Sequence, residues 1–372
     1  MKLLFTNFHD GDGGGHTTYL MALARGLAPR HHVHLAVPPT SRLFREASAL
    51  DGVVVHAQSY PNGLGKLFAS FRAKAQLRAL LQRHDFDIVH VNGSADHRLV
   101  LAVCRGLARR PKIVLTKHNS KSMQGFTHRL RARRTDMAIG VSDATLRELQ
   151  ASPYARCALR SIRNGVAVAH YAPWSAERGV DAKHVWCGDD ALLLGSNAGT
   201  ALHKGWMDLI EALATLPEPQ RARIHVLLCG KPPADAQTQR IAALGLTAQV
   251  HFAGLLGDVR PAVAGIDAGF VLSYAVETIS FACREMMAMG KPVLVSDYAG
   301  LPENIADGSD GWVVPVRDRD AIARALVRLL DTRAQLPAMG AAARAKAERE
   351  FGLHTFVDAT EAAYVSLLPA QG

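Results

Sequence analysis

The feature that most constrains this chain is a repeated alternation of short apolar segments with amphipathic ones. In the first half, six apolar segments have the length and composition of β-strands, and helix-like stretches such as Thr17–Leu27 lie between them. The expected strands are Lys2–Asn7, Val33–Val37, Val53–Ala57, Ile88–Val91, Ile113–Thr116 and Met137–Val141. Repeated strand–helix units of this kind predict a parallel sheet covered by helices on both faces.

The alternation breaks near Arg163–Gly165 and restarts after an irregular stretch that runs to Asp190. The expected strands of the second half are Ala191–Leu194, Ile224–Cys229, Val250–Phe252, Ala268–Leu272, Pro292–Val295 and Gly311–Val314. Helices are expected at Asp320–Ala347 and Thr355–Leu367. The fold class is therefore α/β, with two Rossmann-like, doubly wound parallel-sheet domains facing across a cleft. We place them at residues 1–168 and 169–350, with a C-terminal helix (351–372) that packs back towards the first.

Cysteine usage and apolar run length exclude several protein classes. The five cysteines are widely spaced and contain no Cys-x-x-Cys pair, so neither a disulfide framework nor a structural zinc site is expected. No apolar run approaches the roughly 18–20 residues that span a bilayer. Met1 leads straight into the first expected strand, without the pattern of a signal peptide. A reducing, cytoplasmic setting fits these observations.

A glycine-rich loop joins the first expected strand to the first helix. Gly13–Gly15 permit positive φ and close backbone approach, and the helix start that follows suits an anion. A nicotinamide-binding loop is disfavoured, because the third glycine of that motif falls on His16 and no acid ends the second strand. Two interpretations stay open: a tight turn without a ligand, or a loop that lines the cleft. Asp-x-Asp occurs three times in the chain, so we treat it as chance and expect no metal.

The most informative stretch runs from Ser273 to Val293. Glu277 is expected in the loop at the carboxyl end of a buried strand, and Glu285 inside the helix that follows. Between them lies a helix N-terminus with free N–H groups, around Thr278–Ser280. Such a layout fits a molecule with hydroxyls at both ends and phosphate in the middle, as in a nucleotide sugar. The alternative is a capping acid followed by a solvated helix acid.

With seven residues between the two acids and Ala288–Val293 after them, this block resembles the E-x7-E signature of the group 1 (family 4) glycosyltransferases of the GT-B fold. Other segments resemble family elements in the same order along the chain. They are the loop Gly13–His16, Asp87–His90, Arg163–Val166, Lys204-Gly205 and Asp297–Glu303. The resemblance covers essentially the whole chain, and the ordered set is far more specific than any one segment.

The resemblance implies a retaining enzyme that needs no metal or other cofactor and holds a nucleotide-sugar donor, a UDP-sugar by family habit, in its second domain. It implies that Glu277 contacts the donor sugar, Glu285 the ribose and Lys204 the diphosphate, and that His118 lines the reaction site. The expected catalytic residues are His118, Glu277 and Lys204. The expected donor-binding residues are Gly14, Gly15, Asn197, Lys204, Phe252, Glu277, Thr278, Ile279, Ser280 and Glu285.

Two departures from the family pattern concern the diphosphate. Gly199 stands where the family often has an arginine, so backbone N–H groups of Gly195–Thr200 and the Asn197 side chain are expected to contribute instead. Arg163 replaces a proline. Whether His118 is catalytic or structural is left open. The alternative functions are a nucleotide-sugar epimerase of the same fold and a non-catalytic protein that binds sugar nucleotides or lipid.

The charge is unevenly placed along the chain. Residues 1–165 carry 25 Lys and Arg against 10 Asp and Glu, whereas the rest is mildly acidic. Basic residues expected on the acceptor or membrane side are Lys66, Arg72, Lys74, Arg131, Arg133 and Arg134. Because Leu67, Phe68 and Phe71 lie among them, the segment resembles an interfacial helix on an anionic membrane. We therefore expect a lipid-linked or lipopolysaccharide glycan acceptor, peripheral association with the inner face of the cytoplasmic membrane, and no nucleic acid.

Overall fold

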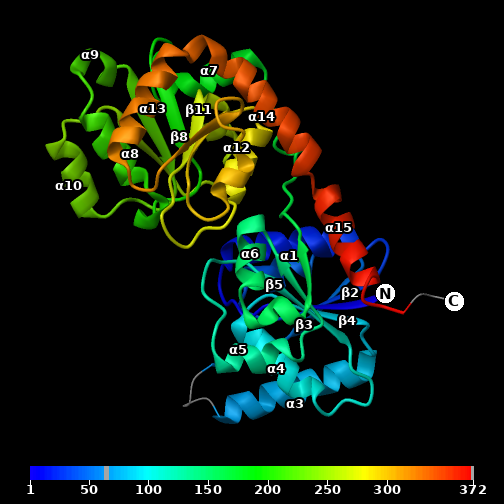
Figure 1. Ribbon diagram of the computed structural model, residues 1–372. Coiled ribbons are helices and arrows are strands. Elements are labelled where there is room, and N and C mark those ends of the chain that lie inside the picture. Colours follow the sequence, from blue (N-terminus) through cyan, green and yellow to red (C-terminus); the bar gives the residue numbers. More distant parts are fainter. Residues whose placement is uncertain (63–66, 370–372) are drawn as a thin grey trace. The chain divides into compact units, whose positions relative to one another are not determined.

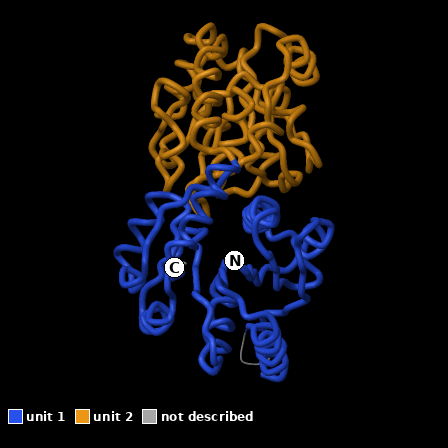
Figure 2. The backbone as a smooth tube through the Cα atoms, turned by 90° about the vertical axis from the view of Figure 1, so that its right-hand side faces the viewer, with its two compact units in different colours: residues 1–165, 353–372 blue, residues 166–352 orange. Residues whose placement is uncertain are grey.

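The structure, a computed structural model, describes residues 1–62 and 67–369. The chain folds into two compact units (Figures 1 and 2). Unit 1 comprises Met1–Gly165 and the C-terminal segment from Leu353, and unit 2 comprises Val166–Gly352. The boundaries expected at residues 168 and 350 lie close to these divisions.

Unit 1 contains a seven-stranded parallel sheet in the order β3-β2-β1-β4-β5-β6-β7. The strands are β1 (Lys2–Thr6), β2 (His32–Val37), β3 (Val53–Ala57), β4 (Ile88–Val91), β5 (Lys112–Lys117), β6 (Met137–Gly140) and β7 (Ala158–Ser161). All six expected strands are present with small shifts at their ends. The sequence pattern missed β7, because this edge strand is only partly buried and has no continuous apolar run.

The helices of unit 1 cover both faces of its sheet (Figure 1). They are α1 (Gly14–Leu27), α2 (Arg42–Ala47), α3 (Leu67–His84), α4 (Ser94–Cys104), α5 (Phe126–Ala132), α6 (Asp143–Gln150) and α15 (Leu353–Val365). Helices α1 and α2 cross the sheet in one direction and α3 and α4 in the other, so right-handed connections place the two pairs on opposite faces. Helix α15 lies against α1. The helix expected from Thr17 begins at Gly14, inside the glycine loop.

Unit 2 contains a six-stranded parallel sheet in the order β10-β9-β8-β11-β12-β13. The strands are β8 (Leu192–Ser196), β9 (Ile224–Cys229), β10 (Val250–Gly254), β11 (Ala268–Val271), β12 (Val293–Ser296) and β13 (Gly311–Val314). Every strand expected in the second half is found. β8, β11 and β12 are buried throughout, which agrees with their uninterrupted apolar sequences.

The helices of unit 2 correct two sequence expectations. They are α7 (Ala176–His184), α8 (Trp206–Ala214), α9 (Glu218–Arg221), α10 (Asp235–Ala243), α11 (Arg260–Gly265), α12 (Phe281–Ala288), α13 (Arg319–Asp331) and α14 (Leu336–Glu350). The stretch before Asp190, expected to be irregular, contains α7, whose mostly polar face gave little apolar periodicity. The helix expected over Asp320–Ala347 is two helices, since the chain turns at Thr332–Gln335 and Pro337 starts a new helix.

Each unit has its own apolar core on the faces of its sheet. Trp206 on α8 and Phe270 on β11 are fully buried in unit 2, and Leu4 and Val89 in unit 1. Among residues 1–62 and 67–369, no helix is both long and apolar enough to cross a membrane.

Candidate active site

The strand order of unit 2 places two loops side by side at the centre of its sheet. After β8 the chain turns to one side for β9 and β10, and it then returns to form β11 on the other side of β8. In open parallel sheets, ligands bind at such a switch point, at the carboxyl ends of the strands. The loops concerned follow β8 and β11, and they carry the predicted residues Asn197, Lys204 and Glu277.

The two loops are joined by an ion pair between Lys204 and Glu277. The Lys204 Nζ lies 2.7 Å from Oε2 of Glu277, and both side chains are largely buried, with 19% and 10% of their surface exposed. The backbone N–H of Tyr274 also donates to the carbonyl of His203, at 2.9 Å. A short 3₁₀ turn, η3 (Leu202–Lys204), therefore presents the lysine directly to the carboxylate after β11.

The Glu277 loop has a strained backbone that its surroundings hold in place. Val276 and Ser280 have φ values of 53° and 54°, and for a β-branched valine this is a rare conformation. The Nδ2 of Asn304 donates to the carbonyl of Ile279 at 2.6 Å, and its Oδ1 accepts from the buried Arg284 at 2.8 Å. Strain of this kind persists only where the surrounding structure holds it, and here Asn304 holds the segment between Glu277 and α12.

Glu285, on α12, reaches over the loop that follows β8. Its Oε2 accepts a hydrogen bond from Nδ2 of Asn197 at 2.7 Å, and the hydroxyl of Tyr171 donates to the same carboxylate. Burial raises the pKa of Glu285, and the two donors oppose that shift. Asn197 Oδ1 is buried without a partner among the described residues. The two predicted acids thus contact opposite ends of the loop after β8: Glu285 contacts Asn197 at its start, and Glu277 contacts Lys204 at its end.

The other donor-site predictions have mixed surroundings. Thr278, Ile279 and Ser280 are buried, and Ser280 caps α12 by accepting from the N–H of Cys283. The N–H of Thr278, expected to be free for phosphate, donates to Oε1 of Glu277 at 3.1 Å. Phe252 on β10 packs edge-on against Trp206, with ring centroids 5.9 Å apart.

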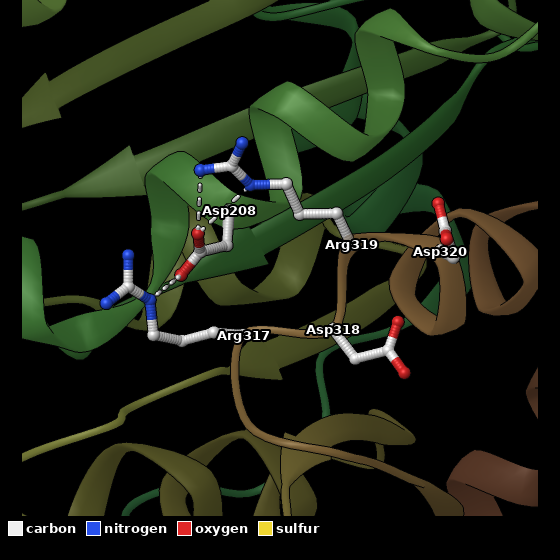
Figure 3. Close-up of a pocket in the computed structure, with 5 residues that line it drawn as sticks. All are labelled: Asp208, Arg317, Asp318, Arg319 and Asp320. Carbon is white, nitrogen blue, oxygen red and sulfur yellow. Dashed lines mark hydrogen bonds and ion pairs between the residues drawn. The ribbon is translucent and has the colours of Figure 1, made fainter.

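A second group of charges anchors α8 beside this site (Figure 3). Asp208, in the first turn of α8, lies 3.4 Å from Arg319 and 3.8 Å from Arg317. The guanidinium of Arg317 covers the ring of Tyr274 at 4.9 Å. The residues that line an open hollow of about 580 Å³ here are Asp208, Arg317, Asp318, Arg319 and Asp320. None of them was predicted, and their contacts tie the Glu277 loop to α8 and α13.

Unit 1 has a matching switch point between β1 and β4. The glycine loop follows β1, Asn92 follows β4, and His118 follows the neighbouring β5. Nε2 of His118 lies 2.9 Å from Oδ1 of Asn92, and its ring lies 4.3 Å from that of His16. Burial, followed by the nearby histidines, holds the pKa of His118 well below its usual range, so its ring is neutral at pH 7.

His16 extends this arrangement into the glycine loop. Its ring also lies 4.3 Å from that of His9, and burial lowers its pKa to about 3. The Nδ1 atom of His16 is buried without a hydrogen-bond partner among the described side chains. Gly14 and Gly15 are exposed, and a Cβ on Gly14 would meet nothing within 4 Å. The loop is therefore open to a ligand on its glycine side.

Asp96 holds the backbone of Asn92 in place through a hydrogen bond. Its Oδ2 accepts from the N–H of Asn92 at 2.8 Å and from the hydroxyl of Thr6 at 2.9 Å. The side chain is fully buried, and burial raises its pKa to about 7. Asp96, Asn92 and His118 thus form one chain of contacts.

This raised pKa predicts a pH-dependent effect of Asp96→Asn. In the unfolded chain the carboxyl titrates near pH 4, so the stabilisation by its protonated form is complete below that pH and is lost as pH rises through about 7. The variant cannot ionise. The free energy of unfolding of the variant, relative to that of wild type, should therefore be about 2–4 kcal/mol higher at pH 8 than at pH 4. Urea unfolding across this range measures the difference, and a constant difference would contradict the prediction.

The basic residues predicted on the acceptor side belong to α3 and α5. Lys66 lies outside the described residues. Arg72 and Lys74 are exposed on α3, where Phe68 and Phe71 are 93% and 70% exposed. Arg131, Arg133 and Arg134, with Leu130, line a hollow of about 290 Å³ between α4 and α5.

Sequence reasoning did not identify Tyr171, Asn92 or His9 as site residues. Tyr171 lies in a segment without periodicity, so no local signal marks it. Asn92 and His9 were detectable in principle, because polar residues just after buried strands gather at one edge of a parallel sheet.

Two protein-family models match the chain, one in each half. Residues 13–170 match the family model described as Glycosyltransferase Family 4, and residues 191–332 match Glycosyl transferases group 1. The lipopolysaccharide core biosynthesis glycosyltransferase LpsE of Rhizobium meliloti is 31% identical over 142 residues, which are 38% of this chain and 40% of LpsE. The amylovoran biosynthesis glycosyltransferase AmsK of Erwinia amylovora is 42% identical over 79 residues, or 21% of this chain and 19% of AmsK.

This chain matches less than half of the length of AmsK, of LpsE and of two D-inositol 3-phosphate glycosyltransferases from Streptomyces. Among solved structures, Anabaena Alr3699/HepE in complex with UDP superposes with a TM-score of 0.83 at 20% identity, covering 98% of this chain and 100% of that one. Both matched family models, in this order, together with a GT-B architecture, show that the chain belongs to the group 1 (family 4) glycosyltransferases.

Proposed function

We propose that the protein is a retaining glycosyltransferase that moves a sugar from a UDP-sugar to a lipid-linked or lipopolysaccharide glycan at the inner face of the cytoplasmic membrane. The observation that carries the proposal is the Lys204–Glu277 pair at the switch point of unit 2, beside Glu285. A cation and two acceptor carboxylates suit a diphosphate flanked by two hydroxyl-bearing sugars. Similarity to UDP-bound HepE and to LpsE supports the donor and acceptor classes.

In the proposed reaction, Lys204 neutralises charge that grows on the departing diphosphate. Nζ leaves Glu277 or is shared with it when the phosphates enter, and Glu277 accepts hydrogen bonds from the donor sugar. Glu285, fixed by Asn197 and Tyr171, accepts from the ribose hydroxyls. With the leaving group stabilised by a protein cation and backbone N–H groups, the step does not require a metal ion.

Retention follows if the acceptor hydroxyl attacks on the face that the diphosphate leaves. The bond between the anomeric carbon and the phosphate oxygen breaks, the bond to the acceptor oxygen forms, and the acceptor proton passes to the diphosphate. Glu277 is already paired with a lysine at 2.7 Å, which suits a hydrogen-bond acceptor better than a nucleophile. His118, neutral and held by Asn92, is the proposed hydrogen-bond partner of the sugar or the acceptor.

Thermal unfolding with a panel of nucleoside diphosphates and nucleotide sugars, in EDTA, tests the donor assignment. We expect UDP and one or more UDP-sugars to raise Tm.

In Glu285→Gln the neutral side chain loses its charge-assisted hydrogen bonds to the ribose, so UDP should bind about 10–100-fold more weakly. Calorimetric titration measures the difference. Glu348→Gln, on the exposed face of α14, is the control and should leave the affinity unchanged. Equal affinities in all three proteins would contradict the assigned ribose contact.

The membrane surface proposed for unit 1 combines apolar side chains with basic ones. Phe68 and Phe71 project from α3, Phe126 is 72% exposed at the start of α5, and Arg72 and Lys74 lie beside the α3 pair. Exposed aromatic residues that alternate with bases are typical of helices lying in a headgroup region.

Replacing both Phe68 and Phe71 with serine should weaken binding to anionic phosphatidylglycerol vesicles by at least about tenfold, because two buried rings are lost from the interface. Vesicle co-sedimentation measures this change. Val185→Ser, at a 70% exposed valine of unit 2, is the control and should bind like wild type. Equal binding by the double variant would remove α3 from the proposed surface.

A further inference from the structure

Three histidines of unit 1 come together outside the loops that carry its candidate site residues. His34 lies on β2, His56 on β3 and His84 at the end of α3. One ring nitrogen of each lies within 4.8 Å of the others. His34 is the third residue of β2, His56 the fourth residue of β3 and His84 the last residue of α3. The cluster therefore lies beside β2 and β3, whereas the glycine loop, Asn92 and His118 follow the carboxyl ends of β1, β4 and β5.

We propose that His34, His56 and His84 bind a zinc ion, as a site separate from the glycosyl-transfer machinery. Zinc prefers imidazole nitrogen at about 2.0–2.1 Å in a tetrahedral arrangement, which puts ligand nitrogens roughly 3.3 Å apart. Nδ1 of His34 and Nε2 of His56 are 2.9 Å apart and already point at each other. Small side-chain rotations of His56 and His84 complete three ligands, and water fills the fourth position.

The surroundings of the cluster suit a metal ligand set. His34 is 6% exposed and packs edge-on against the buried Phe86, with the two ring centroids 5.0 Å apart. An apolar wall of this kind holds the rings and limits solvent access. Lys2, His32 and Arg83 are the basic groups that bear on the cluster, and they weaken cation binding without removing a ligand.

Unit 2 contains a natural control for this geometry. His225 on β9 and His251 on β10 repeat the His34–His56 pair, with the same Nδ1 to Nε2 distance of 2.9 Å. Both pairs are stacked at 8°, with ring centroids 5.3 Å and 5.2 Å apart. The aromatic neighbour of the second pair is Trp186, and the described residues offer no third histidine there that completes a metal set. A two-histidine pair and a three-histidine cluster can therefore be compared within one chain.

The test uses the full chain, purified without a histidine tag and stripped with EDTA. Calorimetric titration with zinc chloride should show one saturable equivalent, and cobalt should give the visible absorption of a tetrahedral site. His84→Gln and His56→Gln should each weaken zinc binding at least about tenfold, since even indirect partners of a ligand contribute 10–100-fold. His225→Gln should bind like wild type. Saturating zinc should raise Tm by about 5 °C in wild type and not in His84→Gln.

Three outcomes would overturn the proposal: no saturable equivalent, an equivalent that survives both His56→Gln and His84→Gln, or one that is lost in His225→Gln. Thermal unfolding in EDTA shows whether each variant is folded, and His84, on the partly exposed end of α3, is the substitution least able to disturb the fold. No donor-site residue is changed, so the result is independent of the glycosyltransferase proposal.

Discussion

Replacing Lys204 with methionine is expected to lower kcat by about 100–1,000-fold, the usual cost of removing one group that stabilises developing negative charge. The lysine is the only basic side chain that the described contacts of Glu277 include, at 2.7 Å. Without it, the departing diphosphate loses the cation that lies beside Glu277. Initial rates with saturating UDP-sugar, beside UDP titration of the same protein, separate the loss in kcat from a loss in affinity.

Lys346→Met is the matched control for this prediction. Lys346, also in unit 2, pairs at 3.6 Å with the buried Asp310, which precedes the edge strand β13. Both variants lose one lysine from a partly buried ion pair, so both lose some stability. Only Lys204→Met should lose catalysis. A kcat within a few-fold of wild type in Lys204→Met would show that other groups stabilise the leaving diphosphate.

Replacing Gly205 with alanine is expected to destabilise unit 2 by roughly 3 kcal/mol or more, because substitutions that cause a clash in a packed region are among the most destabilising. Gly205 has φ 74°, and a Cβ there would lie 1.9 Å from the carbonyl oxygen of Leu272. The neighbour is the backbone of the residue just after β11, so it cannot rotate away as a side chain could. The η3 turn must therefore move, and Lys204 moves with it, so UDP affinity should fall together with stability. Urea unfolding and UDP titration measure the two effects.

Gly245→Ala separates the clash from backbone strain. Gly245 has φ 71°, but a Cβ there would meet nothing within 4 Å. Its cost should be about 1–2 kcal/mol, from the left-handed conformation alone. If the two variants unfold at the same urea concentration, close packing of Gly205 on β11 is not what fixes the lysine turn.

Much of the architecture followed from local pattern. Buried parallel strands are short apolar runs between amphipathic helices, so their number and approximate ends were visible in both halves of the chain. Where burial is partial the pattern fails: β7 is an edge strand and α7 has a mostly polar sequence, and both were missed. The E-x7-E block, with its ordered companions, was specific enough to indicate the family before any fold was known.

The sequence by itself therefore determined the two α/β units, the residues that form the candidate site, and the protein family. Only the tertiary structure decided which of these residues meet. Lys204 and Glu277 are 73 positions apart, Asn197 and Glu285 88, and Asn92 and His118 26. Strand order brings each pair together, because the loops beside a switch point share one edge of the sheet wherever they lie in the chain. The strain at Val276 and the His34–His56–His84 cluster also depend on packing between distant segments, which no local periodicity records.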